Sequence, residues 1–236
     1  MAETKVIILA AGDGSRWGNY RDTTKHLVTV EREVLLHRTC KQFLKYTNDV
    51  AVIGLDERYK VDGTSLYIIK SPNTNWKDGA KIMSSKPLWS TNGRTVLVFG
   101  DVYFTHDAVK AIMTDDKELC FFLRKGPNET TGARWKEIFA IAFKSHMNNQ
   151  VSQTTLLQIS RGQMNVQAGW SLYKAMIGPV FGGDMFANNR YVEIDDWTED
   201  FDFPEDLEIW EAHRKAAKTE NAAKTRATKA AGKKSK

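Results

Sequence analysis

The chain has 236 residues, of which 42% are hydrophobic and 27% are charged, and its formal net charge is +5. These values are typical of globular proteins, and the length suffices for one sizeable core or two small ones. No apolar run approaches the roughly 20 residues that span a bilayer, and residues 1–5 do not resemble a signal peptide, so we expect a cytoplasmic protein without a membrane segment.

The positive charge is concentrated at the C-terminus. Residues 214–236 contain nine lysines or arginines and one acid, a net charge of +8, which leaves −3 for residues 1–213. Because this tail is rich in alanine, lysine and threonine, it cannot bury a core. We expect one domain over residues 1–213 and a basic tail over residues 214–236 that is disordered or partly helical. Such a tail predicts weak, non-specific contact with nucleic acid.

Strands and helices alternate in the first hundred residues. The hydrophobic pattern predicts strands over residues 6–9, 50–55, 66–69 and 95–101 and helices over residues 33–46 and 79–89. Pro87 predicts a kink or an early end in the second helix. Such alternation is typical of a mostly parallel sheet with helices on both faces. Ligands of these sheets bind at the carboxyl ends of the strands, where Gly12 and Asp101 both fall.

The second half of the chain is less regular. We expect strands over residues 119–123, 138–143 and 191–194 and helices over residues 151–159 and 167–176. Pro204 opens the last predicted helix at its first turn, where Glu205 and Asp206 are favourably placed against the helix dipole.

The segment after the first strand is the most distinctive part of the sequence. Residues 6–9 are wholly apolar, and the small residues Ala10–Gly12 and Gly14 that follow let backbone N–H groups approach a polyphosphate closely. Arg16 adds a planar fork of donors, and Lys25 adds a mobile positive charge. A glycine turn alone occurs in many ordinary loops, so the order of strand, small-residue turn, arginine and lysine carries the specificity.

This segment resembles the signature of the sugar-nucleotide and molybdenum-cofactor-guanylyltransferase-like nucleotidyltransferases, Leu-Ala-Ala-Gly-x-Gly-x-Arg followed by Pro-Lys. Thr24 stands where the family usually has proline, and the segment before Lys25 is longer than usual. The resemblance implies a GT-A-like, Rossmann-related α/β fold with Arg16 and Lys25 as catalytic residues. It also implies a nucleotide-binding set made of Leu9, Ala10, Ala11, Gly12, Gly14, Ser15 and Gly79.

The same resemblance implies a Mg²⁺ site. Gly100-Asp101 matches the family's Gly-Asp at the end of the central strand, which supplies a metal ligand. Asp202 matches the acid of a later Asp-x-Pro-Glu-Asp-Leu-like segment that completes the site. Asp200 lies on the same face as Asp202 if the segment is extended, so it remains an alternative ligand. A turn aspartate and a solvated acidic loop are the structural alternatives for these residues.

The base and the acceptor are assigned more loosely. By resemblance, the nucleobase lies beside the loop and helix over residues 71–85, where Gly79 and Met83–Ser85 match the family in part. Residues 134–137 and 170–174 mix aromatic and charged side chains, as sugar or choline pockets often do. Half-buried surface aromatics would give the same pattern.

The resemblance predicts an Mg²⁺-dependent enzyme that moves a nucleoside monophosphate from a nucleoside triphosphate to a phosphorylated small-molecule acceptor, such as a sugar 1-phosphate, and releases pyrophosphate. One alternative is glycosyl transfer from a nucleotide sugar, with nucleic acid as one candidate acceptor, but Gly100-Asp101-Val102 lacks the second acid of the usual Asp-x-Asp motif. Another is a nucleic-acid-associated protein that acts through its tail, against which the acidic body counts.

Overall fold

A seven-stranded sheet forms the centre of the computed structural model, which describes residues 3–12, 14–69, 78–163, 168–178 and 184–233. Its strand order is β10 (Tyr191–Glu193), β8 (Leu119–Arg124), β9 (Glu137–Lys144), β6 (Arg94–Phe99), β1 (Thr4–Leu9), β4 (Val50–Gly54) and β5 (Ser65–Ile68). β9 runs antiparallel to both of its neighbours, whereas the other neighbouring pairs are parallel. The predicted mostly parallel sheet is therefore confirmed.

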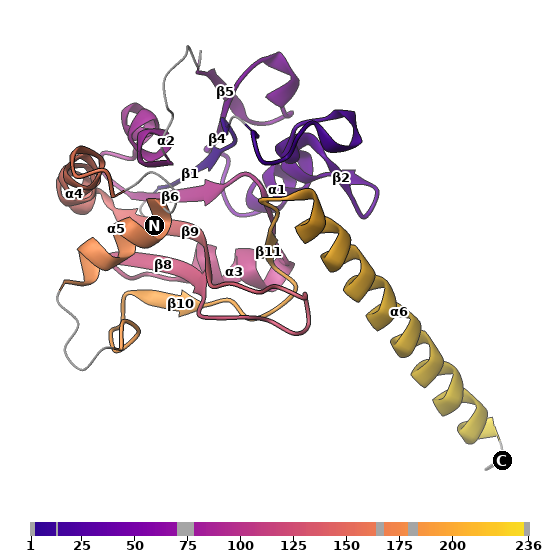
Figure 1. Cartoon of the computed structure of the whole chain (residues 1–236). Coiled ribbons are helices and arrows are strands. Elements are labelled where there is room, and N and C mark those ends of the chain that lie inside the picture. The colour runs from indigo at the N-terminus through magenta and orange to yellow at the C-terminus, as the bar shows by residue number, and fades with distance from the viewer. Residues whose placement is uncertain (1–2, 13, 70–77, 164–167, 179–183, 234–236) are drawn as a thin grey trace.

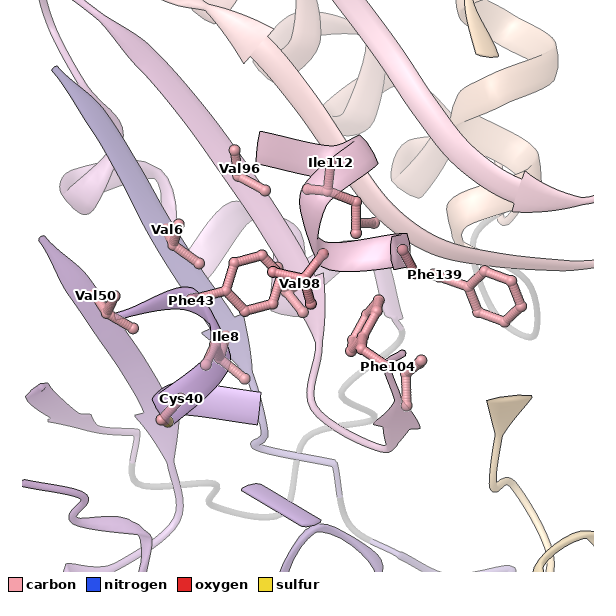
Figure 2. Packing of buried hydrophobic residues seen from close by; sticks show 14 of the residues in the cluster. Val6, Ile8, Cys40, Phe43, Val50, Val96, Val98, Phe104, Ile112 and Phe139 are labelled. Carbon is pink, nitrogen blue, oxygen red and sulfur yellow. The ribbon is translucent and has the colours of Figure 1, made fainter. Parts of the chain in front are cut away.

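Helices cover both faces of this sheet (Figure 1). One face carries α1 (Leu35–Phe43) and α3 (His106–Thr114), and the other carries α2 (Asp78–Ser84), α4 (Asn148–Ser160) and α5 (Ala168–Ile177). On the first face, Phe43 of α1 packs edge-to-face on Phe104, with ring centroids 5.8 Å apart, against Val98 of β6 (Figure 2). Alternate residues of β1 join the two cores, because a central strand is buried on both sides.

The predicted elements of the first half are present with shifted ends. The helix expected over residues 79–89 ends at Ser84 and is followed by a 3₁₀ turn over Lys86–Leu88. Pro87 is the physical reason, because its ring fixes φ and removes a backbone donor. α4 and α5 correspond to the helices predicted over residues 151–159 and 167–176.

A third apolar cluster lies beyond the end of the sheet and positions the segments around the site. It contains Trp17, Val28, Val30, Leu35, Tyr103, Phe201, Leu207 and Trp210. These residues come from the loop after β1, from the start of α1, from two short pairs of antiparallel strands and the residues beside them, and from the start of α6 (Pro204–Lys233). One pair is the hairpin β2–β3 (Thr29–Val30 and Glu33–Val34), and the other joins two segments distant in the chain, β7 and β11 (Val102–Tyr103 and Glu199–Asp200).

The last helix, α6, extends from this cluster away from the body (Figure 1). Its early turns are fastened to the body: Arg214 donates to Glu31 at 3.1 Å, and its guanidinium lies 4.7 Å from the ring centroid of Trp197. Lys218 pairs with the same carboxylate of Glu31. The helix continues without a break across residue 213, and residues 218–225 are all exposed. No helix among the described residues combines the length and the apolar character needed to cross a membrane.

Candidate nucleotide and metal site

Three carboxylates converge where β6 ends. Asp101, Asp200 and Asp202 each offer an oxygen, and these oxygens lie within 4.8 Å of one another. The antiparallel pairing of β7 with β11 brings them together, since Asp200 pairs with Val102 and the N–H of Phe201 donates to the carbonyl of Asp101 at 3.1 Å. Phe201 is fully buried in the third cluster, so the extended backbone turns its two neighbouring aspartates the other way, toward Asp101.

Gly100 allows the ends of two strands to meet here. Its N–H donates to the carbonyl of Leu9 at 3.0 Å. A Cβ at this position would lie 2.8 Å from the Cβ of Ala10, so any side chain would push β6 away from β1. The glycine before Asp101 thus places the carboxylate directly beside the loop that follows β1.

Two cations meet the carboxylates. Lys25, in a 3₁₀ turn over Lys25–Leu27, pairs through Nζ with Asp101 and lies 3.1 Å from Oδ1 of Asp202. Nη2 of Arg16 lies 2.8 Å from the same Oδ1. Lys25 is buried, which by itself would lower its pKa, but the three carboxylates raise the pKa above its ordinary value. Lys25 is therefore a fixed positive charge at neutral pH.

The carboxylates differ in protonation behaviour. Burial raises the pKa of Asp200 well above its ordinary value, and the charges of Asp101 and Asp202 raise it further. Burial also acts against ionised Asp101, but Lys25 outweighs it and lowers the pKa of Asp101. The raised pKa of Asp200 means that Lys25 and Arg16 do not supply enough positive charge for all three carboxyl groups to ionise readily, and a further cation would favour the ionised form of Asp200. Mg²⁺ prefers such hard oxygen ligands, so the donor set fits this ion.

The cluster opens into a cavity of about 90 Å³ at the carboxyl ends of the strands. Its lining includes the predicted residues Leu9, Gly12, Arg16, Lys25, Asp101 and Asp202. The other lining residues are Asp200, His26, Lys81, Phe99, Glu137, Ile138, Gly169 and Trp170. The loop after β1, the β7–β11 pair and the end of the sheet therefore meet at one small space between two cations and three carboxylates.

His26 and Glu137 are buried members of this lining that the sequence analysis did not assign to the nucleotide. Burial lowers the pKa of His26 to about 3, so its imidazole is neutral at physiological pH. Burial likewise raises the pKa of Glu137 to about 8, and the charges of Asp202 and Asp101 add to that effect. The position of His26 directly after Lys25 was the available signal, but a single histidine without a partner at ligand spacing did not support an assignment.

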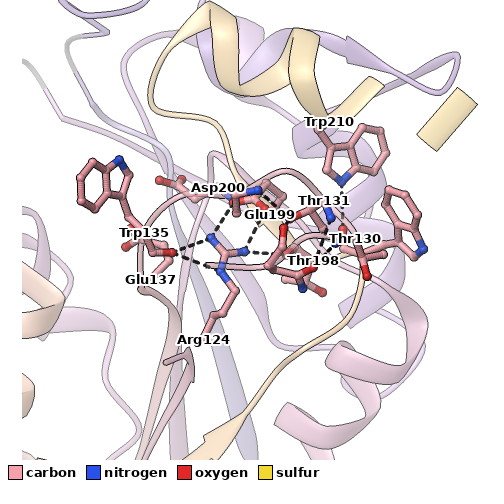
Figure 3. A network of polar contacts seen from close by, with 12 residues as sticks. Arg124, Thr130, Thr131, Trp135, Glu137, Thr198, Glu199, Asp200 and Trp210 are labelled. Carbon is pink, nitrogen blue, oxygen red and sulfur yellow. Dashed lines mark hydrogen bonds and ion pairs between the residues drawn. The ribbon is translucent and has the colours of Figure 1, made fainter. Parts of the chain in front are cut away.

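A second cavity of about 530 Å³ adjoins the first and shares Glu137, Asp200 and Asp202 with it. Further lining comes from Arg124, Thr131–Trp135, Glu199, Phe203, Glu205, Asp206, Glu208 and Ile209. Arg124 is held in the wall by two hydrogen bonds to buried Glu199, at 2.8 and 2.9 Å, and by bonds to the carbonyl of Trp135 (Figure 3). The side chain of Trp135 is 77% exposed, so an indole face at this cavity is accessible to solvent.

Comparison with known proteins gives structural matches only. No family model matches the sequence, and no curated protein matches it. The CTP:phosphocholine cytidylyltransferase from Streptococcus pneumoniae is similar in structure, with a TM-score of 0.59 and 15% identity over 87% of this chain and 96% of that one. The inositol-1-phosphate CTP transferase from T. maritima has a TM-score of 0.59 and 15% identity, over 91% and 97% of the two chains.

A third similar structure is the 2-C-methyl-D-erythritol 4-phosphate cytidylyltransferase from Thermus thermophilus, with a TM-score of 0.58 and 15% identity over 90% of this chain and 99% of that one. All three cover nearly the whole of both chains. The chain has the nucleotidyltransferase fold.

Within the nucleotidyltransferase fold, the predicted nucleotide-binding residues fall into two groups. Leu9 and Gly12 line the small cavity, whereas Ala10 and Ala11 are buried beneath it. Gly14 has a positive φ of 62°, and Ser15 and Gly79 join it outside the described lining. Gly79 is buried in α2. Residues 71–77 of the predicted base-binding region, residues 71–85, lie outside the described residues.

The two segments predicted to bind the acceptor, residues 134–137 and 170–174, have different surroundings in the structure. Trp135, Glu137 and their neighbour Arg134 line the large cavity. Tyr173 instead belongs to the core, where its hydroxyl donates to the carbonyl of Met185 at 2.8 Å. Trp170 is buried and lines only the small cavity among the described residues. An aromatic at helical spacing fits a core and a pocket equally well, so the sequence did not separate them.

Proposed function

We propose that the protein is a nucleotidyltransferase that moves a nucleoside monophosphate from a nucleoside triphosphate to a phosphorylated small molecule and releases pyrophosphate. The observation that carries this proposal is the meeting of Asp101, Asp200 and Asp202 with Lys25 and Arg16 at the end of the β1 loop. Few reactions need a dense cluster of both signs beside a small-residue loop, and phosphoryl chemistry is the principal one.

The carboxylates of Asp101, Asp200 and Asp202 would hold Mg²⁺. When bound, this ion supplies positive charge to the phosphate oxygens and orients them. Because Arg16 and Lys25 contact the same carboxylates, a cation at the cluster takes over their role there. The guanidinium of Arg16 and the ammonium of Lys25 then face the phosphates and stabilise the negative charge that develops as pyrophosphate leaves. Each would act mainly on the step itself, because that charge is largest in the transition state.

The attacking group needs no protein base. A phosphate monoester is ionised at neutral pH, so its oxygen can attack the α-phosphorus once it is held in line. The adjoining large cavity supports the placement of the acceptor, because it opens directly onto Asp200 and Asp202. Positioning of the two reactants is then the main task of the protein.

The lining of the large cavity favours an acceptor that also carries an amine. Its two arginines face seven carboxylic acids, and Arg124 is already neutralised by Glu199. Even without Glu137 and Asp200, whose pKa values are raised, the acids outnumber the arginines. The exposed faces of Trp135 and Phe203 suit a cation, which is attracted to aromatic rings. Among the similar structures, one is named for phosphocholine, which is cationic, and another for inositol 1-phosphate, which is not.

The test is pyrophosphate release with Mg²⁺ across the four ribonucleoside triphosphates and a panel of acceptors. Glucosamine 1-phosphate and N-acetylglucosamine 1-phosphate form a matched pair, because acetylation removes the positive charge and keeps the sugar phosphate. We expect release to require both an acceptor and Mg²⁺, and to favour the amine of the matched pair. If no acceptor on the panel raised release above the rate without protein, the proposed function would be refuted, whereas preference for the acetylated sugar would refute only the acceptor charge.

A further inference from the structure

The outer part of α6 carries its basic positions on one face. A residue turns the helix by about 100°, so positions along α6 can be placed on a wheel from the backbone alone. Counted from Arg214, six of the seven basic residues between 214 and 233 fall within an arc of about 120°. We define this set as the basic stripe: Arg214, Lys215, Lys218, Arg226, Lys229 and Lys233.

The opposite side of the helix has a different composition. Ala216, Ala217, Ala223 and Ala227 lie there, together with Glu220 and Lys224, which pair with each other. No residue larger than alanine is apolar on this side. A membrane-surface helix needs leucine, phenylalanine or tryptophan opposite its basic face, and a coiled coil needs an apolar seam. Neither a bilayer nor a second helix therefore suits this surface.

Like charges lie close together in the basic stripe, and they destabilise the helix when no anion is bound to it. Lys215 and Lys218, Arg226 and Lys229, and Lys229 and Lys233 are three or four positions apart, and each such like-charge pair destabilises a helix by about 0.2–0.5 kcal/mol. The pairs that Arg214 and Lys218 make with Glu31 offset part of this cost, and residues 218–225 are exposed. A regular row of anionic groups along the helix would offset it.

We infer that the basic stripe of α6 binds the phosphate backbone of nucleic acid, without sequence preference, through Lys215, Arg226, Lys229 and Lys233, since Arg214 and Lys218 are already paired with Glu31. From residue 215 to residue 233 the stripe extends over 18 residue steps, or about 27 Å at 1.5 Å per residue. A duplex presents one phosphate charge per about 1.7 Å of axis, and its major groove admits an α-helix. The body, with a charge of −3, adds no attraction, so the contact is weak and depends strongly on salt. It would keep the enzyme near a nucleic acid while the site works on small molecules.

The decisive experiment moves charges without changing their number. The relocated variant combines Arg226→Ala with Ala227→Lys and Lys229→Ala with Ala223→Lys, which shifts two charges to the opposite side of α6. Alanine and lysine are both good helix formers, and circular dichroism verifies that helix content is kept. Binding of a fluorescent 20-base-pair DNA is measured for wild type and the relocated variant between 30 and 300 mM salt, with an RNA duplex of the same sequence as a second probe.

We expect the relocated variant to bind DNA on the order of 10- to 100-fold more weakly at 0.1 M salt, and the slope of log K against log salt to fall by about 2, because two phosphate contacts are lost. Equal affinity and equal slope for the two proteins would show that net charge alone determines DNA binding. That result would overturn the proposal that the basic stripe is the binding surface. So would tighter binding of wild type to vesicles with phosphatidylserine, or to polyglutamate, than to either duplex. Binding is read without turnover, so the outcome is independent of the proposed catalytic function.

Discussion

Oδ1 of Asp202 contacts both cations of the site, Lys25 and Arg16. These two ion pairs reduce the repulsion among the carboxylates, which explains how three acids can lie close together beside a buried lysine. The carboxylates gain nearby positive charge from these contacts, and the contacts hold both cations where the proposed function places the phosphates. The first two predictions follow from this sharing of charge.

We expect Asp101→Asn and Asp202→Asn each to lower turnover on the order of 10²-fold or more, since each removes a charge at the metal and phosphate site while preserving side-chain shape. Pyrophosphate release measures the effect, and thermal melting shows whether the fold is intact. Asp62→Asn is the matched control, because Asp62 is exposed and outside both described cavities. Turnover within a few-fold of wild type for Asp101→Asn would exclude this residue as an essential ligand.

Asp200→Asn is expected to separate stability from activity. Because burial and like charges raise the pKa of Asp200, its ionised form destabilises the metal-free protein. The neutral variant should therefore melt at a higher temperature than wild type in EDTA at pH 7.5, and yet turn over more slowly with Mg²⁺. A lower melting temperature in EDTA would mean that Asp200 is not under electrostatic stress.

At the scale of elements, the long strands were predictable and the short pair β7–β11 was not. β1 and β6 are continuous apolar runs that end in small residues, so their ends and the adjacent cations could be located from the sequence alone. β7 and β11 have two residues each, too few to show a period of two. The pairing that brings Asp200 and Asp202 to Asp101 was therefore inferred only by resemblance, as was the choice between the two later acids.

β9 is a second element that the pattern did not orient. Its eight residues are buried at nearly every position, whichever way the strand runs. Buried strands of either direction have the same composition, so its antiparallel pairing with β6 and β8 left no trace in the sequence. The burial of His26 and of Glu137 likewise depends on neighbours that are distant along the chain, which a single sequence does not reveal.

Glu31 fastens α6 to the body in a pH-dependent way. Burial raises its pKa, but bonds from Lys218, Tyr103 and Arg214 outweigh this and lower it from 4.5 to about 2. Because the folded value is the lower one, the stabilisation is complete above pH 5 and is lost as the pH falls through about 4 toward 2. We expect Glu31→Gln to be less stable than wild type in urea unfolding at pH 7, with the difference shrinking at pH 3. A difference that is constant with pH would contradict this.

Truncation locates the functional end of α6. Ending the chain at Thr219 keeps Arg214 and Lys218, and every removed residue whose burial is described, residues 220–225, is exposed, so we expect pyrophosphate release within about twofold of wild type and an unchanged melting temperature. Ending it at His213 removes both basic partners of Glu31 and should lower the melting temperature. If the longer truncation product also lost catalysis on a small acceptor, the outer helix would belong to the catalytic domain, and a boundary near residue 213 would be mistaken.

At the scale of the whole molecule, the body and the tail carry opposite net charge. The body places a cluster of both signs at the carboxyl ends of a mostly parallel sheet, and its net charge is −3. The tail places +8 on a segment that leads away from that site (Figure 1). If both proposals hold, the acidic body would keep a polyanion on the tail away from the cavities, while the cations at the site would still attract small nucleotides.

The measurement that tests the central claim most directly is ³¹P NMR of a reaction that contains the protein, Mg²⁺, a nucleoside triphosphate and a phosphorylated acceptor. The account predicts that the triphosphate is converted into equal amounts of pyrophosphate and a diphosphate-linked product that holds the α-phosphorus, and that Asp101→Asn forms neither. Release of a nucleoside diphosphate from a nucleotide sugar, with the triphosphates left intact, would contradict it.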